Sequence, residues 1–295
     1  MPHPAPVHGR MGRMRVVDAH LHLWDPAVLS YDWLEGPLLR SFGPAELDAA
    51  LAEAPDAEYG FVFVQAECAP EQSLAEVDWV AALAGRVGVR GIVARAPLED
   101  PHATREHLAA YADRPLVVGV RRLLQSEPAG FSATPGFRES ARAVASAGFT
   151  FDACVRWTQL PDVVELADAV PELTIVLDHL GKPDVGSAEA PGPAEGTPWA
   201  ESLRDLARRP HVVCKLSGLP AEAQGAWTAA QLRPFLDVAL DAFGPGRLLF
   251  GSDWPVSGPY GRWAETVTTW LDERVGEHGR HAVLAGNAER VYRLA

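Results

Sequence analysis

The feature that most constrains the fold is a regular alternation of short apolar runs with longer, alanine-rich amphipathic segments. Eight apolar runs are candidate strands, at residues 16–21, 59–65, 89–94, 117–121, 149–155, 173–177, 212–216 and 248–252. Eight amphipathic segments are candidate helices, at residues 44–53, 72–84, 104–111, 135–147, 159–169, 199–208, 229–243 and 263–274. Strict alternation of strands and helices predicts an α/β fold with a parallel sheet, and eight repeats in 295 residues predict a single (β/α)8 TIM barrel.

An open, doubly wound sheet is the alternative that the same alternation allows. A dinucleotide-binding version of that fold would carry a G-x-G-x-x-G motif after its first strand, and no such motif follows residues 16–21. No second domain is indicated. We therefore expect one barrel domain over residues 15–295, preceded by a disordered leader at residues 1–14.

Composition and charge argue against several classes of protein. The formal net charge of −13 disfavours nucleic acid and anionic membrane surfaces as partners. No stretch approaches the roughly 20 apolar residues that cross a bilayer, and the N-terminal residues lack the apolar segment of a signal peptide, so we expect a cytoplasmic protein. The cysteines, Cys68, Cys154 and Cys214, are widely spaced, which predicts reduced, buried thiols.

The first and last apolar runs carry the residues with the clearest chemistry. His20 and His22 lie two residues apart at the end of the first run, and side chains with this spacing on a strand share one face. Asp253 follows the eighth run. A closed barrel brings these two ends together, so that two imidazoles and a carboxylate can bind a divalent metal or activate a water molecule.

Further polar and aromatic residues follow the other runs, where the active site of a (β/α)8 barrel lies. His179 can donate to a substrate carbonyl, bind metal or be a buried core histidine. Because neighbours on a strand face opposite ways, only one of Arg121 and Arg122 should point inward. No role is assigned to Glu67, and Arg95 leaves the end of the third run ambiguous.

Several other residues are candidates for substrate binding. Lys182 and Lys215 can each bind an anionic substituent or form a salt bridge at the barrel rim. Gln65 can bind a hydroxyl group. Tryptophans near the strand ends can form a wall around a ring-shaped substrate. The full candidate set for substrate binding is Trp24, Gln65, Arg156, Trp157, Lys182, Lys215 and Trp254.

Six segments resemble the lactonase-like branch of the amidohydrolase superfamily, also called amidohydrolase family 2. They are Asp-Ala-His-Leu-His-Leu-Trp-Asp-Pro at 18–26, Gly-Val-Arg-Arg at 119–122, Leu-Asp-His-Leu-Gly-Lys-Pro at 177–183, Cys-Lys-Leu-Ser-Gly-Leu at 214–219, Leu-Leu-Phe-Gly-Ser-Asp-Trp-Pro-Val at 248–256 and Gly-Asn-Ala-Glu-Arg-Val-Tyr at 286–292. The branch includes L-fuconolactonase, L-rhamnonolactonase and 4-sulfomuconolactone hydrolase. The resemblance implies a (β/α)8 barrel that hydrolyses a small lactone, with Arg121 as the inward-facing arginine.

The chain also departs from the binuclear members of the superfamily. Arg121 and Arg122 stand after the fourth run, where those members carry a bridging lysine or glutamate. The resemblance therefore implies at most one metal, held by His20, His22, Asp253 and His179, with zinc as the expected ion. Catalysis without a metal stays open.

The mechanism that we expect assigns Asp253 as the base that deprotonates water, and His179 and Arg121, or the metal, as the groups that stabilise the oxyanion. The expected substrate is a sugar-acid or muconate-type lactone. A metal-dependent decarboxylase, another hydrolase of a small carboxylated ring and a non-catalytic binding protein are the alternatives. Either a monomer or a homodimer is compatible with the sequence.

Overall fold

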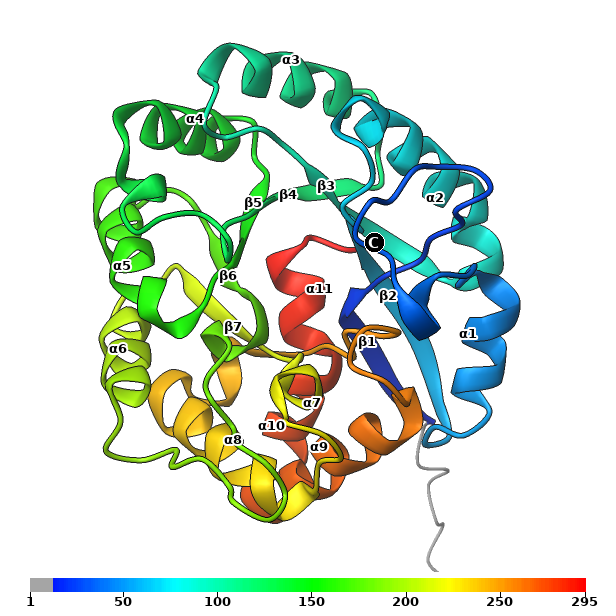
Figure 1. Cartoon of the computed structure of the whole chain (residues 1–295), viewed down its shortest axis with the longest axis vertical. Helices are drawn as coiled ribbons and strands as arrows, with labels where there is room; N and C mark the ends of the chain where they lie inside the picture. Colours follow the sequence, from blue (N-terminus) through cyan, green and yellow to red (C-terminus); the bar gives the residue numbers. More distant parts are fainter. Residues whose placement is uncertain (1–12) are drawn as a thin grey trace, which may run out of the picture.

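The computed structural model describes residues 13–295, which form a closed ring of eight parallel strands inside a ring of helices (Figure 1). The strands pair in sequence order, so the predicted barrel is confirmed and the open-sheet alternative is wrong. Their bounds are β1 Met14–Leu21, β2 Ala57–Val64, β3 Val89–Arg95, β4 Val117–Leu123, β5 Thr150–Cys154, β6 Ile175–Leu177, β7 Val212–Leu216 and β8 Leu248–Phe250. Of the predicted leader, residues 1–12 lie outside the described residues, and Met14 already belongs to β1.

The ring closes between the first and last strands by hydrogen bonds that continue beyond β8. The backbone N–H of Asp253 donates to the carbonyl oxygen of His20 at 2.8 Å, and that of His22 donates to Trp254 at 2.9 Å. The eighth strand is shorter than predicted, because the chain turns at Asp253, whose φ of 55° is incompatible with a strand. Closure nevertheless keeps Asp253 directly beside β1.

Helices cover the outside of the barrel. All eight predicted helices are present, and the short segments α7, α10 and α11 had not been predicted, because four or five residues are too few for a periodic pattern. The bounds are α1 Pro44–Leu51, α2 Ser73–Val87, α3 Pro101–Ala112, α4 Pro135–Ser146, α5 Leu160–Ala169, α6 Pro198–Ala207, α7 Leu219–Glu222, α8 Ala229–Phe243, α9 Tyr260–Arg274, α10 Glu277–His281 and α11 Asn287–Val291.

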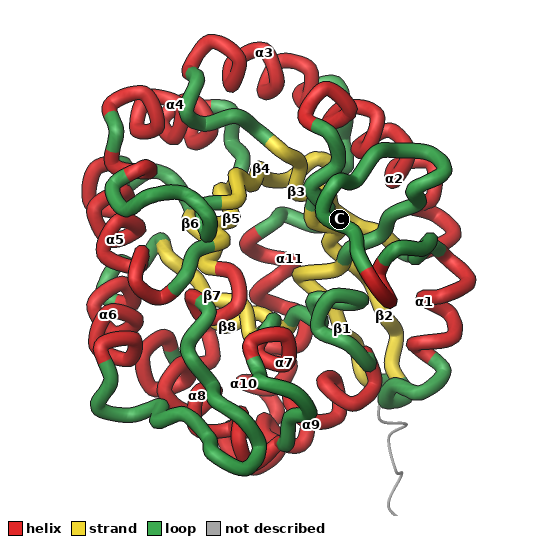
Figure 2. Tube along the Cα trace, in the orientation of Figure 1, coloured by secondary structure: helices red, strands yellow, loops and turns green. Residues whose placement is uncertain are grey.

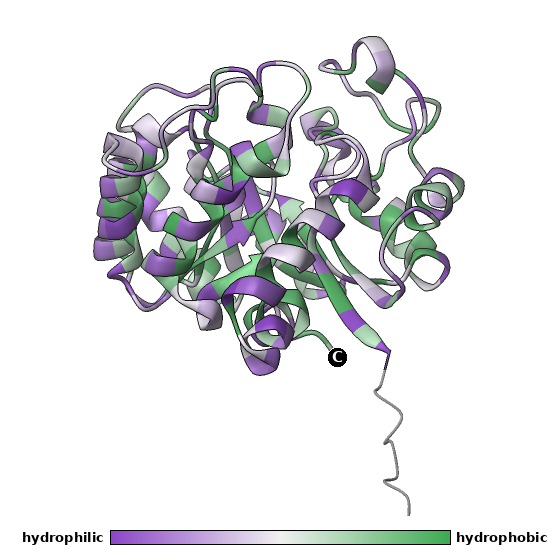
Figure 3. Cartoon of the chain, turned by 90° about the horizontal axis from the view of Figure 1, so that it is seen from below, coloured by the Kyte–Doolittle hydropathy of each residue, from purple (hydrophilic) through white to green (hydrophobic). Residues whose placement is uncertain are grey.

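The apolar side chains form two layers. One lies between strands and helices, and the other fills the barrel interior, where Val17, Val62, Val93 and Leu249 pack together with Tyr292 after α11. Figure 3 shows the strands as mainly hydrophobic and the outer faces of the helices as mainly hydrophilic. None of the helices within residues 13–295 has the length and apolar character needed to cross a membrane.

Loops after the carboxyl ends of the strands gather over one mouth of the barrel (Figure 2). The longest of them, between β1 and α1, is fixed by paired backbone hydrogen bonds of 3.1 and 2.8 Å between Trp24 and Phe42. These loops form the walls around the polar residues that the strand ends carry, as in other (β/α)8 barrels.

Candidate active site

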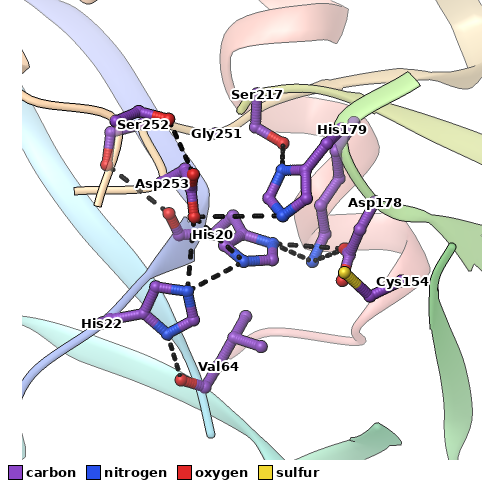
Figure 4. A network of polar contacts seen from close by, with 12 residues as sticks. His20, His22, Val64, Cys154, Asp178, His179, Ser217, Gly251, Ser252 and Asp253 are labelled. Atoms are coloured by element: carbon purple, nitrogen blue, oxygen red, sulfur yellow. Dashed lines mark hydrogen bonds and ion pairs between the residues drawn. The ribbon is translucent and has the colours of Figure 1, made fainter. Parts of the chain in front are cut away.

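The two ends of the barrel sheet meet at three imidazoles and one carboxylate. The Nε2 atoms of His20 and His22 lie 3.1 Å apart. Oδ1 of Asp253 lies 3.6 Å from the first of these atoms and 3.3 Å from the second. Nε2 of His179 lies 3.9 Å from the same oxygen. Figure 4 shows the four side chains pointing toward one another, and we call them the His–Asp cluster.

Hydrogen bonds on the far side of the rings orient the first two histidines. Nδ1 of His22 donates to the carbonyl oxygen of Val64 at 2.8 Å. Nδ1 of His20 lies 3.1 Å from Oδ1 of Asp178. Carbonyl and carboxylate oxygens accept hydrogen bonds, so Nδ1 carries the proton in both rings and each Nε2 presents a lone pair to the His–Asp cluster.

His179 is held by local backbone geometry. It follows β6 in a left-handed conformation, with φ of 55°, and Nδ1 lies 2.9 Å from the hydroxyl of Ser217. Gly218 has φ of 71° and packs so closely against the imidazole that a Cβ atom there would overlap the ring. The sequence Ser217-Gly218 therefore supplies both the hydrogen-bond partner of His179 and the space for its ring.

Asp253 is fixed through its second carboxylate oxygen. The hydroxyl of Ser257 donates to Oδ2 at 2.7 Å, which leaves Oδ1 toward the histidines. Burial opposes ionisation, but His179, the hydrogen bond from His22 and His20 together hold the pKa of Asp253 well below its usual range. Asp253 is therefore ionised at neutral pH.

Burial has the opposite consequence for the charge of the histidines. It lowers the pKa of His20 well below its ordinary value, and it lowers the pKa of His179 to about 4. Both rings are therefore neutral at pH 7, in the form that can accept a proton or bind a metal.

A buried ionic network lies behind His20. The chain has two lysines among its 26 basic residues, and one of them, Lys215, is fully buried. Its Nζ lies 2.5 Å from Oδ2 of Asp152, 3.0 Å from Oδ1 of Asp178 and 3.1 Å from Nδ1 of His20. Burial alone would lower the pKa of Lys215, but the two carboxylates outweigh it and raise the pKa. The ammonium donates to these carboxylates, which leaves Asp178 as the acceptor for the Nδ1 proton of His20.

Asp152 and Asp178 had not been predicted as site residues. Asp178 directly precedes His179, and this adjacency was an available signal. Asp152 lies within β5, where the sequence shows an apolar run, and the hydroxyl of Tyr292 donates to it at 2.8 Å. This last contact joins β5 to the segment after α11, 140 residues later in the sequence, and no local sequence pattern reveals it.

The two adjacent arginines of β4 point to opposite faces. Arg121 is buried, with Nη2 2.5 Å from the carbonyl oxygen of Gln65 and Nη1 3.5 Å from Oδ2 of Asp178. Arg122 forms ion pairs with Glu99 and Glu127 outside the barrel. Alternation along the strand allows only one of the two to face the interior, and these contacts identify it as Arg121.

The His–Asp cluster has the composition of a divalent-metal site. Ligand atoms of His20, His179 and Asp253 all lie within 4.8 Å of one another. Two lone pairs that face each other at 3.1 Å, as those of His20 and His22 do, repel unless a cation or a proton lies between them. Three imidazoles and one carboxylate are typical zinc ligands, so the residues fit this ion.

A cavity of about 490 Å³ opens over the cluster. Its wall includes five predicted residues, namely His22, Arg121, His179, Lys182 and Asp253. Lys182 also pairs with a glutamate, since its Nζ lies 3.4 Å from Oε1 of Glu222. Two partly exposed apolar side chains, Trp33 and Val256, contribute to the same wall.

The structure places the other predicted substrate-binding residues away from this cavity wall. Trp24 is fully buried, and its indole donates to the carbonyl oxygen of Arg40 at 2.8 Å. Trp254 is also buried and packs edge-on against Phe42. Both indoles stabilise the loop between β1 and α1, because its apolar residues fold back over them.

Gln65 and Lys215 do not line the cavity, and both are fully excluded from solvent. Arg156 lies outside, with its side chain 57% exposed and Nη1 3.9 Å from Glu222. Trp157 begins a short 3₁₀ helix and packs against the core. Two residues without a predicted role, Glu67 and Arg95, do line the cavity.

Several known proteins are similar to this chain in sequence and in fold. The L-fucono-1,5-lactonase of Burkholderia multivorans is 35% identical, over 96% of this chain and 97% of that protein. The L-fucono-1,5-lactonase of Burkholderia ambifaria is 31% identical, over 94% and 95%. A crystal structure of a Burkholderia multivorans amidohydrolase with bound zinc is 32% identical, covers 95% of this chain and 100% of that one, and superposes with a TM-score of 0.80. The amidohydrolase family model matches residues 17–294. The chain therefore belongs to the amidohydrolase family, and it is a hydrolase.

Proposed function

We propose that this protein hydrolyses a small lactone, and specifically a sugar-acid lactone, by attack of water on the ring ester. The observation that carries the proposal is the His–Asp cluster beside a cavity of about 490 Å³, with the ionised carboxylate of Asp253 next to the neutral imidazoles of His20 and His179. Support for the substrate class comes from two relatives named L-fucono-1,5-lactonase, each aligned over more than nine-tenths of this chain.

Asp253 is the proton acceptor in this reaction. Ser257 holds Oδ2, so Oδ1 is the oxygen that can take a proton from water in the cavity. The resulting hydroxide forms a bond to the lactone carbonyl carbon, and the carbonyl oxygen becomes an oxyanion. When the carbonyl re-forms, the bond to the ring oxygen breaks, and Asp253 returns the proton to that oxygen. The product is an open-chain hydroxy acid.

Arg121 and His179 are placed to stabilise the oxyanion. Both line the cavity, and Arg121 brings a permanent positive charge. Because the Ser217 hydroxyl can donate to Nδ1 of His179, Nε2 of this ring can carry a proton and donate it to the oxyanion when no metal is bound. His20 and His22 then orient the attacking water through their Nε2 lone pairs.

The residues also allow a metal-assisted form of the same reaction. His20, His22, His179 and Asp253 would hold one divalent ion, for which zinc is the proposed identity. When bound, such an ion supplies Lewis-acid polarisation and lowers the pKa of a water ligand. Asp178 and Val64 keep the two N-terminal histidines in the tautomer that this binding requires.

The test is proton release from L-fucono-1,5-lactone by the purified protein, measured with a pH indicator before chelation, after chelation and after zinc is restored. Asp253→Asn removes the base but keeps the shape, and Asp32→Asn is the matched control because Asp32 also lines the cavity. We expect ring opening by the wild type and the control, and its loss in Asp253→Asn. The proposal is overturned if no sugar-acid or muconate-type lactone is opened in any metal state, or if Asp253→Asn retains full turnover.

A further inference from the structure

Glu67 has a strained backbone at the edge of the cavity. It follows β2, lines the cavity and has φ of 55°, in the left-handed region that side chains other than glycine rarely adopt. Such residues persist only where their surroundings hold them, and they concentrate at ligand sites. Two hydrogen bonds with Gln65 help to hold Glu67 in this conformation.

Gln65 holds Glu67 at both its backbone and its side chain. The backbone N–H of Glu67 donates to Oε1 of Gln65 at 2.7 Å, and Nε2 of Gln65 donates to Oε1 of Glu67 at 2.5 Å. Gln65 is fully buried, so it provides a rigid support. One carboxylate oxygen, Oε2, has no hydrogen-bond donor within residues 13–295.

Arg95 ends the neighbouring strand β3 and lines the same cavity. Its guanidinium forms no ion pair or hydrogen bond with any residue of the described chain. The two other cations in the wall both have partners. Arg121 contacts the carbonyl oxygen of Gln65 and the carboxylate of Asp178, and Lys182 pairs with Glu222. An arginine and a carboxylate thus face one cavity with unused hydrogen-bonding groups, without pairing with each other.

We infer that Glu67 and Arg95 bind the ring hydroxyls of the lactone, with Gln65 as the residue that positions Glu67. A hydroxyl both donates and accepts, so a carboxylate and a guanidinium together can bind neighbouring hydroxyls, Glu67 as the acceptor and Arg95 as the donor. An anionic substituent fits less well, because the carboxylates of Glu67 and Asp32 line the same cavity. The inference rests on the proposed function and adds the residues that select the substrate.

The test compares two lactones that share a six-membered ring and a methyl group. L-fucono-1,5-lactone carries ring hydroxyls, and δ-hexanolactone lacks them. For Glu67→Gln we expect KM for the hydroxylated lactone to rise about tenfold, since a hydrogen bond to a charged group is lost, with KM for δ-hexanolactone unchanged. Arg95→Gln should give the same selective effect. Glu172→Gln, which removes an exposed carboxylate between α5 and β6, outside the cavity, should change neither KM.

A second variant separates binding from support of the fold. Glycine adopts the left-handed region readily, so Glu67→Gly should unfold at the same or a higher temperature than the wild type while its KM for the hydroxylated lactone rises. The inference is overturned if Glu67→Gln and Arg95→Gln shift both lactones equally or leave both unchanged while the wild type turns both over. If the wild type opens neither lactone nor any other sugar-acid or muconate-type lactone in any metal state, the proposed function itself fails, and this inference fails with it.

Discussion

Replacing Lys215 by methionine tests whether the buried ionic network stabilises the barrel. The side chain is fully buried, and its Nζ lies 2.5 Å from Asp152 and 3.0 Å from Asp178. Methionine has a similar length but no charge, so the variant leaves Asp152 without a cation and leaves Asp178 with Arg121 alone, at 3.5 Å. Removing one partner of a buried ion pair typically costs about 3–5 kcal/mol, which corresponds to a fall in Tm of roughly 5–8 °C for a chain of 295 residues.

The effect should depend on pH in a defined direction. In the wild type, Lys215 and His20 hold the pKa of Asp178 well below its ordinary value despite burial, so this carboxylate stabilises the fold at neutral pH and loses that contribution as the pH falls. Burial already raises the pKa of Asp152 to about 6 in the wild type, although Lys215 opposes this shift. In Lys215→Met the pKa of Asp152 therefore rises further, so its ionised form is destabilising at pH 7 and protonation relieves the penalty. The difference between wild type and variant should therefore shrink from pH 7 to pH 5.

Urea denaturation at both pH values, in the presence of a chelator so that metal binding does not contribute, measures the free energy of unfolding. The matched control is Lys182→Met, the chain's other lysine, whose pair with Glu222 at 3.4 Å lies at the cavity wall. We expect the control to lose less than Lys215→Met, because the side chains of Lys182 and Glu222 keep part of their surface in contact with solvent. A loss for Lys215→Met no larger than that of the control, or one that does not shrink at pH 5, would refute the reasoning.

Three further changes have defined outcomes. Asp253→Asn should lower kcat for lactone opening by about 10²–10⁴-fold while far-ultraviolet circular dichroism stays unchanged, because a general base contributes rate enhancement of that order. Gly218→Ala places a Cβ against His179, so it should lower both turnover and the zinc content measured by atomic absorption, and unchanged values would contradict the packing seen here. Burial raises the pKa of Glu76 to about 7, so its ionisation destabilises the fold as the pH rises. Glu76→Gln should therefore increase Tm relative to the wild type more at pH 8 than at pH 5, and an equal difference at both would argue against this shift.

Periodicity alone determines most of the architecture. Eight apolar runs separated by amphipathic segments allow few topologies, and a closed barrel necessarily sets its first strand beside its last. The proximity of His20, His22 and Asp253 follows from that closure together with the alternation of side chains along β1. The inward direction of Arg121 follows from the same alternation, once the family resemblance selects it over Arg122.

Depth within the barrel and the packing of loops were decided only by the tertiary structure. Sequence position on a strand indicates which face a side chain takes, but not how far it lies below the cavity, and so Gln65 and Lys215 were expected to contact substrate although both are fully buried. Trp24 and Trp254 lie in the core because loop residues distant in sequence cover them. Asp152 belongs to the site because it contacts the buried Lys215 and the C-terminal Tyr292. Only the closed barrel brings these residues together. They lie far apart in the sequence, so no local pattern predicts the contacts.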